Sequence, residues 1–144
     1  MRNILIINTC GMAVGGITNH ILTYMKALLS SDRNYDVTLI ATIFYDESVI
    51  KQFKKIGCKV ITLPNRKTNL ISYIKKLWRV YKTGGFDVVH VHGSSSLLSI
   101  ELFLAKMAGI KIRIAHCHST QTEHKLCNYL LSPLFRISYN KSLA

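Results

Sequence analysis

Acidic residues and proline are scarce in this 144-residue chain. Seven Asp and Glu stand against 19 Lys and Arg, which gives a formal net charge of +12, and there are only two prolines. Hydrophobic residues make up 49% of the chain, a composition that is not typical of a disordered tail and that suits one domain with a sizeable core. The excess of positive charge favours a polyanion or an anionic membrane surface as a partner.

Long apolar runs and paired cysteines are also missing. No apolar run approaches the ~20 residues of a membrane span, and the run after Arg2 is too short for a secretory signal. We therefore expect a cytoplasmic protein. The four cysteines have no C-x-x-C spacing, which favours buried reduced thiols over a zinc site or disulfides; they are Cys10, Cys58, Cys117 and Cys127.

Several enzyme signatures are absent. There is no G-x-S-x-G, and no acid stands in a plausible triad order near residues 94–96, which disfavours a hydrolase. The first glycine-rich loop has neither the G-x-G-x-x-G spacing nor the lysine of a P-loop. A nicotinamide cofactor would also require an acid near the end of the second strand, where the sequence reads Leu-Ile-Ala-Thr.

Apolar strand-like runs alternate with segments of helical periodicity, which predicts an α/β fold. A first strand buried on both faces and right-handed crossovers predict a Rossmann-like parallel sheet of at least five strands, order 3-2-1-4-5, with helices on both faces, in one domain over residues 1–144. The first strand lies in the run from residue 3. The other predicted strands are 36–42, 59–63, 87–91 and 111–115, the helices are 17–29, 46–56, 69–81 and 97–108, and residues 123–144 read as helix interrupted at Pro133.

Ligands of such sheets bind outside the carboxyl ends of the strands, where the loops 9–16, 92–96 and 116–120 converge. Gly15 and Gly16 open a helix in the first loop, so a ligand can approach the backbone there. The free N–H groups of the first helical turn favour an anion. The alternative is that both glycines only form a tight turn.

Two His-x-His pairs, at 90/92 and 116/118, lie at the ends of neighbouring strands, and alternation directs each pair to one side of the sheet. One interpretation is a metal site of up to four imidazoles, disfavoured because no carboxylate lies beside them. The favoured interpretation makes His90 and His116 core residues hydrogen-bonded to backbone, with His92 and His118 reaching the crevice.

Three motifs in this order carry a resemblance: the early Gly-Gly that opens a helix, Phe-Asp-Val-Val-His-Val-His-Gly at 86–93, and Arg-Ile-Ala-His-Cys-His-Ser at 113–119. Together they resemble the N-terminal half of the family 4 glycosyltransferases, retaining enzymes of the GT-B fold. The resemblance runs over nearly the whole chain. It implies a hexosyltransferase that uses a nucleotide-sugar as co-substrate, with no other cofactor and no bound metal.

The resemblance also implies roles for residues. It places the donor diphosphate on Gly15, Gly16 and Ile17, and the transferred sugar beside His118, which we expect to be the catalytic residue that positions it. The expected acceptor-binding residues are His20, His92, Gly93, Ser119 and Thr120.

In that family a C-terminal domain binds the nucleotide and carries two glutamates seven residues apart, whereas this chain has only Glu47, Glu101 and Glu123. The chain therefore resembles a truncated N-terminal, acceptor-side domain that lacks the nucleotide-sugar-binding domain, and we expect it to be inactive alone. We expect the full enzyme to transfer a sugar to a glycan or lipid-linked acceptor in cell-surface polysaccharide synthesis. The alternatives are a non-catalytic module that binds sugar-nucleotides or membranes, and a nucleotide-sugar epimerase.

Residues 48–86 hold ten basic residues and no acid. Within them, helix 69–81 has an apolar stripe of Leu70, Ile71, Tyr73, Ile74, Leu77, Trp78 and Tyr81, with Lys75, Lys76, Arg79 and Lys82 opposite. The basic face predicts peripheral docking at the inner face of an anionic membrane. Solvated charge over a core stripe is the simpler alternative, and no recognition motif supports a nucleic-acid partner.

Overall fold

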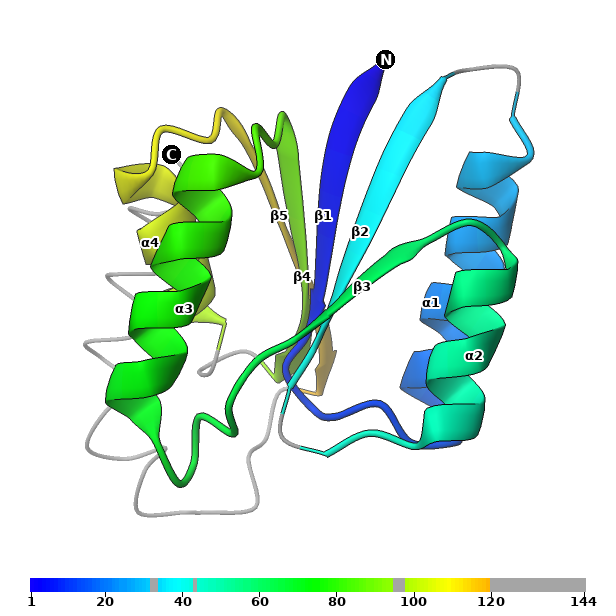
Figure 1. Ribbon diagram of the computed structural model, residues 1–144, viewed down its shortest axis with the longest axis horizontal. Helices are drawn as coiled ribbons and strands as arrows, with labels where there is room; N and C mark the ends of the chain where they lie inside the picture. Colours follow the sequence, from blue (N-terminus) through cyan, green and yellow to red (C-terminus); the bar gives the residue numbers. More distant parts are fainter. Residues whose placement is uncertain (32–33, 43, 95–97, 120–144) are drawn as a thin grey trace.

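The computed structural model describes residues 1–31, 34–42, 44–94 and 98–119, which form a parallel five-stranded sheet between two layers of helices (Figure 1). The strand order is β3-β2-β1-β4-β5, which confirms the predicted Rossmann-like topology. The strands are β1 (Arg2–Asn8), β2 (Tyr35–Ala41), β3 (Lys59–Thr62), β4 (Val88–Ser94) and β5 (Ile112–Ser119). The helices are α1 (Gly16–Leu29), α2 (Glu47–Lys55), α3 (Leu70–Thr83) and α4 (Ser99–Met107). The predicted final helix, at 123–144, lies outside the described residues.

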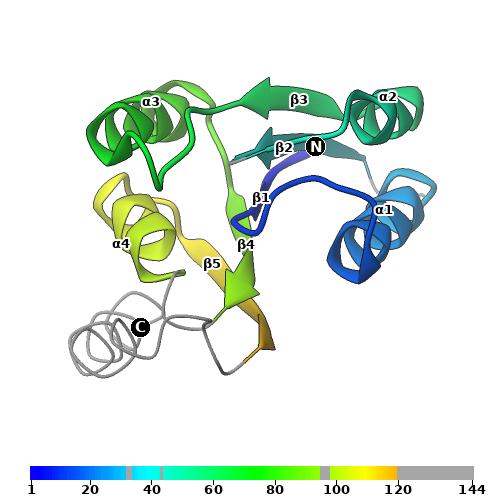
Figure 2. The same cartoon turned by 90° about the horizontal axis from the view of Figure 1, so that it is seen from below.

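The central strand β1 is apolar along its length because it is covered on both sides. Ile4 and Ile6 pack in the cluster beneath α1 and α2, whereas Leu5 and Ile7 pack in the cluster beneath α3 and α4. Successive side chains of a strand point to opposite faces, so an unbroken apolar run supplies both cores. Figure 2 shows the two pairs of helices on opposite sides of the sheet.

Strands β4 and β5 extend further than the sequence predicted, by three and four residues at their carboxyl ends. His92 pairs with Asn8 of β1 on one side and with His116 of β5 on the other. The backbone of β4 finds hydrogen-bond partners in the strands on both sides. β4 therefore continues past His92, and its pairing with β5 becomes irregular only between Gly93 and Ser94. His92, His116 and His118 therefore lie within strands rather than beyond their ends.

Helix α3 buries a narrower stripe than predicted. Tyr73, Leu77 and Tyr81 are buried, but Leu70 and Ile71 are exposed, Ile71 to 70%. The first turn of the helix thus extends past the sheet, and its apolar side chains are available to a partner.

Not all of the basic residues between 48 and 86 belong to an open surface. Arg66 is buried and its Nη1 lies 2.8 Å from Oε1 of Glu101. Lys59 forms a hydrogen-bonded ion pair with Asp36. The positive surface is therefore smaller than the sequence predicted.

The prediction that the cysteines are buried was only partly correct. Of the three cysteines in the described residues, Cys58 is buried, whereas Cys10 and Cys117 are exposed. Burial raises the pKa of the Cys58 thiol to about 11, which makes it unreactive at neutral pH. Within the described chain, no helix combines the length and the apolar character needed to cross a membrane.

Candidate active site at the carboxyl edge of the sheet

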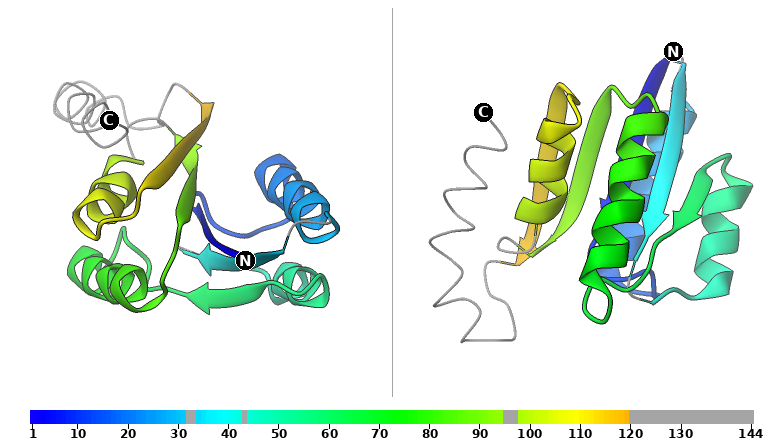
Figure 3. Two further views of the ribbon diagram at one scale, coloured as in Figure 1. Left: turned by 90° about the horizontal axis from the view of Figure 1, so that it is seen from above. Right: turned by 60° about the vertical axis from the view of Figure 1, so that its left-hand side comes forward.

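All five strands end at one edge of the sheet, and the segments that follow β1, β2 and β3 start there (Figure 3). The loop after β1 is held in place by hydrogen bonds between the side chains of Asn8 and Thr9 and the backbone. Asn8 Nδ2 donates to the carbonyl of Gly11 at 2.7 Å, while Asn8 Oδ1 accepts from the amide of Cys10 at 3.0 Å. Thr9 Oγ1 donates to the carbonyl of His92 at 3.0 Å. The loop that leads to the glycine pair is therefore held against β4.

The amino end of α1 is open. Gly15 is its N-cap, in an extended conformation with φ 173°, and no side chain caps the helix or places an acid in its first turn. By contrast, the side chains of Asp46 and Asn69 accept hydrogen bonds from the first turns of α2 and α3. The first N–H groups of α1 are thus left for an anion.

Neither glycine of the pair is required by the backbone. Gly15 and Gly16 lack the positive φ that favours glycine, and a Cβ added to either would meet nothing within 4 Å. A tight turn therefore does not explain them. Their open surroundings do allow a ligand to lie directly against the main chain.

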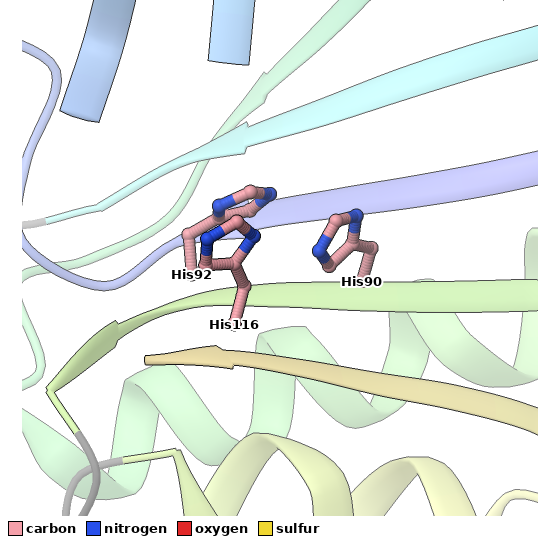
Figure 4. Close-up of side chains that lie close together, drawn as sticks. All are labelled: His90, His92 and His116. Atoms are coloured by element: carbon pink, nitrogen blue, oxygen red, sulfur yellow. The ribbon is translucent and has the colours of Figure 1, made fainter. Parts of the chain in front are cut away.

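Five imidazoles gather on the α1 side of β4 and β5. The rings of His92 and His116 stack with centroids 4.9 Å apart, those of His116 and His118 at 4.5 Å, and those of His90 and His92 lie 4.1 Å apart. His20, on α1, lies 5.0 Å from His116 and 5.8 Å from His118, centroid to centroid. Figure 4 shows His90, His92 and His116 rising from the two strands toward the same side, as the alternation predicted.

The expected division of roles among the histidines was correct for the burial of His90 but wrong for its hydrogen bonding and for the position of His92. Neither ring nitrogen of His90 has a hydrogen-bond partner within the described residues, and His92, expected in the crevice, is 0% exposed. The residues of β5, His116 and His118, are the half-buried members of the cluster. The reason is the length of β4, which places His92 between β1 and β5 instead of at the rim.

Burial and repulsion between the rings lower the pKa values of three histidines in the cluster. Desolvation, followed by the charges of His116, His20 and His118, lowers the pKa of His90 to about 4. Desolvation and then the charge of His90 lower the pKa of His92 to about 2. The pKa of His118 is also lowered, first by desolvation and then by His116 and His20. At pH 7 these three rings are therefore hydrogen-bonding groups without charge.

The helix opening and the cluster lie together. His20 follows Gly16 by four residues, so the two share one face of α1. The ring of His20 contacts the ring of His118. His118 Nε2 in turn lies 3.1 Å from His92 Nδ1. An open phosphate-type helix end and an array of neutral imidazoles therefore border the same part of the carboxyl edge.

Residues 14–143 match the Glycosyltransferase Family 4 domain. The chain belongs to Glycosyltransferase Family 4. No curated protein and no solved structure matches it. Membership confirms the resemblance drawn from the three motifs and identifies the fold as the N-terminal half of a GT-B enzyme, a family that uses a nucleotide-sugar donor and an acceptor.

The other residues that we expected in the site of this Family 4 domain differ in burial and in their distance from the open end of α1. Gly93 is buried, and a Cβ there would lie 2.0 Å from Thr9 Oγ1, so its backbone approaches the β1 loop rather than open space. Ser119 ends β5, and Thr120 lies outside the described residues. Ile17 is half-buried behind the glycine pair. The four basic residues of α3 are exposed, with Lys82 Nζ 5.3 Å from the Trp78 ring centroid.

The favoured interpretation of the sequence separated His90 and His116 from His92 and His118, whereas the structure gathers all four rings in one cluster. Their alternation along the two strands was visible, but the register that sets His92 opposite His116 was not. The ring contact to His20 was also hidden, because it depends on where α1 crosses the sheet.

Proposed function

We propose that this domain is the acceptor-side half of a retaining glycosyltransferase that transfers a sugar from a nucleotide-sugar to a glycan or lipid-linked acceptor. The observation that supports this best is the open amino end of α1 beside neutral imidazoles. Its N–H groups suit a diphosphate, and the imidazoles suit the hydroxyls of a sugar.

In the proposed reaction, the bond between the anomeric carbon and the diphosphate oxygen breaks while the acceptor oxygen bonds to the same face of that carbon. The proton of the acceptor hydroxyl leaves with the diphosphate. The N–H groups of Gly16 and Ile17 stabilise the negative charge that develops on the leaving group. His118, which is neutral at pH 7, donates or accepts a hydrogen bond and positions the sugar rather than acting as a strong base.

Acceptor contacts are proposed for His20, Gly93, Ser119 and Thr120, with His92 acting through its hydrogen bond to His118. Exposed apolar side chains follow the ends of β1 and β2 at the same edge: Val14, Phe44 and Tyr45. They suit a second domain that faces this edge and supplies the groups for base and ribose. We therefore propose that the 144 residues alone do not transfer sugar and that the nucleotide-binding half is required.

Titration of the full chain with UDP, GDP and inorganic diphosphate, followed through backbone amide resonances, tests the half-site. We expect shifts confined to Gly15, Gly16 and their neighbours, with a dissociation constant of about 1 mM or weaker because few groups contact the ligand. Gly16→Val should remove the shifts without unfolding the chain, since its Cβ meets nothing. Ala27→Val, an exposed change near the other end of α1, is the matched control. Submicromolar binding, or shifts at the opposite edge of the sheet, would contradict the proposal.

A second proposal concerns docking. We propose that α3 docks on an anionic membrane through Lys75, Lys76, Arg79 and Lys82, and that the enzyme works peripherally at the inner face of the cytoplasmic membrane. Ile71, Lys75 and Arg79 recur every four residues and so share one side of the helix. The exposed Ile71 adds an apolar contact that the buried stripe cannot give.

Sedimentation with vesicles separates this docking from diffuse charge attraction. We expect the chain to bind vesicles rich in anionic lipid and not neutral ones, because each basic residue near such a surface contributes about 1 kcal/mol. The charge reversals Lys75→Glu and Arg79→Glu should abolish binding. Lys51→Glu and Lys55→Glu, an exposed pair of the same spacing on α2, should weaken it less. Equal losses for both pairs would show that no particular face is used.

A further inference from the structure

Two histidines in the cluster, His90 and His92, have buried ring nitrogens without a hydrogen-bond partner in the described residues. Among the described residues, Nδ1 and Nε2 of His90 and Nε2 of His92 are buried and accept or donate no hydrogen bond. Buried polar atoms almost always have partners, and leaving one without a partner costs about 1–3 kcal/mol. Three such atoms from two adjacent side chains point to a ligand that the chain alone does not supply.

His116 completes a donor set with these two. One ring nitrogen each from His90, His92 and His116 can be chosen so that all three lie within 4.8 Å of one another. Nitrogens that share an ion at ~2.1 Å lie about 3.4 Å apart in a tetrahedral arrangement and at most about 4.2 Å apart. The three rings, which lie side by side in Figure 4, would therefore have to turn so that their nitrogens approach one another around one ion.

The hydrogen bond of His92 supports this assignment. If His92 Nδ1 carries the proton and donates to His118 Nε2 at 3.1 Å, its Nε2 has a lone pair that points into the cluster. Metal-binding histidines usually donate their second ring N–H to a neighbouring acceptor, which fixes the tautomer. His118 would be that acceptor, outside the ligand shell.

We propose that His90, His92 and His116 bind a divalent transition-metal ion of the Zn²⁺ type. Neutral imidazoles favour Zn²⁺, Co²⁺, Ni²⁺ or Cu²⁺ over Mg²⁺ and Ca²⁺, which take oxygen ligands. The sequence disfavoured a metal because no carboxylate lies beside the histidines, but three imidazoles can hold such an ion without one. His118 is a hydrogen-bonding neighbour of His92, and the exposed ring of His20 on α1 lies 5.0 Å from that of His116, centroid to centroid. The ion would join β4 to β5 at the edge that carries the sugar site, and it does not depend on glycosyl transfer.

Cobalt is a direct probe, because Co²⁺ in a tetrahedral nitrogen site absorbs strongly in the visible. We expect the full chain to bind one Co²⁺, and Zn²⁺ to displace it. His116→Ala, which removes a half-buried ligand, should weaken binding by more than about a hundredfold, beyond the range of second-shell changes. His118→Ala should weaken it less, within the ~10–100-fold range of second-shell changes.

Thiols provide the necessary control. Cys117 lies between His116 and His118 on the opposite face of β5, and both it and Cys10 are exposed. The variant Cys10→Ser, Cys117→Ser should keep the Co²⁺ spectrum and affinity. Loss of the spectrum in that variant, no tetrahedral spectrum with the unmodified chain, or undiminished affinity in His116→Ala would each overturn the proposal.

A measurement on the unmodified chain avoids dependence on a variant that misfolds. Imidazole ¹⁵N resonances followed during Zn²⁺ addition report which histidines bind. We expect large shifts of one nitrogen in each of His90, His92 and His116, at one Zn²⁺ per chain. Shifts confined to other histidines would refute the site.

Discussion

The two faces of the sheet bury polar groups in different ways. Beneath α3 and α4, Oε1 of Glu101 accepts from Arg66 Nη1 at 2.8 Å and from the Tyr73 hydroxyl at 2.7 Å, while the Tyr81 hydroxyl donates to the Glu101 carbonyl at 3.0 Å. The buried carboxylate thus has an opposite charge and two hydrogen bonds, although its Oε2 has none. These hydrogen bonds join the loop after β3 to α3 and α4, and they are formed between groups of the chain itself.

On the α1 face the polar groups are imidazoles without acids. No carboxylate contributes to the pKa shifts of His90, His92 or His118, whose perturbing neighbours in the described chain are other histidines. Buried polarity that is balanced within the chain is explained by folding. Polarity that stays unbalanced costs stability, and such groups concentrate at functional sites. The contrast is consistent with a structural role for the polar groups beneath α3 and α4, and with the ligand binding that we propose for the imidazole face.

Glu101→Ala should have the largest effect on stability. It removes the charge that neutralises buried Arg66 and the acceptor of the Tyr73 hydroxyl, and breaking a buried ion pair costs about 3–5 kcal/mol. Chemical denaturation monitored by circular dichroism measures the loss. As a control, Arg66→Met with Glu101→Met removes both charges and should be less destabilised than Glu101→Ala. A loss below about 1 kcal/mol would mean that the network is not a stability element.

Alkaline pH tests the same face through its tyrosines. Burial, and next the charge of Glu101, raise the pKa of Tyr73 and Tyr81 well above 10. The unfolded chain ionises near pH 10 while the folded chain does not, so stability present below pH 10 is lost as the pH rises above it. The slope is at most about 1.4 kcal/mol per pH unit for each tyrosine.

Unfolding free energies at pH 9 and pH 11 should therefore differ more in the unmodified chain than in Tyr73→Phe. The half-exposed Tyr45→Phe is the control and should keep the full pH dependence. A pH dependence that Tyr73→Phe leaves unaltered would contradict the assignment of these shifts.

Gly93→Ala tests how tightly β4 packs against the β1 loop and Leu98 at the carboxyl edge of the sheet. The new Cβ would lie 2.0 Å from Thr9 Oγ1 and 3.0 Å from Leu98 Cδ2, and overpacking of this kind costs about 1–3 kcal/mol. The paired variant Gly93→Ala, Thr9→Gly removes the main clash and should recover part of the loss. An Ala variant as stable as the original chain would show that the β1 loop moves freely there.

The sequence predicted the balanced face poorly and the fold well. Strand order, crossover direction and the buried first strand follow from the apolar run of β1 and from local periodicity, which act within a segment. Glu101 was counted only as one of three glutamates, and Arg66 only as surface charge. Their pairing joins positions 35 residues apart, and no local pattern encodes such a contact.

The imidazole face was partly predictable. Alternation placed His90 with His92 and His116 with His118, and the Gly-Gly opening of α1 indicated an anion. The burial of the histidine rings could not be predicted from the sequence. It depends on the position of α1 over β4 and on the length of β5, which ends four residues later than predicted. The ends of strands are set by neighbours in the sheet, so the error fell on the residues that matter most for the site.

His90→Leu should have the smallest effect on the free energy of unfolding, and it should stabilise the chain where the other substitutions destabilise it. It is the most direct test of the difference between the two faces of the sheet. It replaces two buried ring nitrogens that have no partner with an apolar side chain of similar size, so we expect the metal-free chain to gain about 1 kcal/mol. Denaturation in the presence of a chelator measures this gain. With Zn²⁺ added the order should invert, because the ion stabilises the unmodified chain by RT ln(1 + [Zn²⁺]/Kd) and the variant lacks a ligand. Destabilisation of the chelated variant would place His90 with the balanced polar groups of the other face.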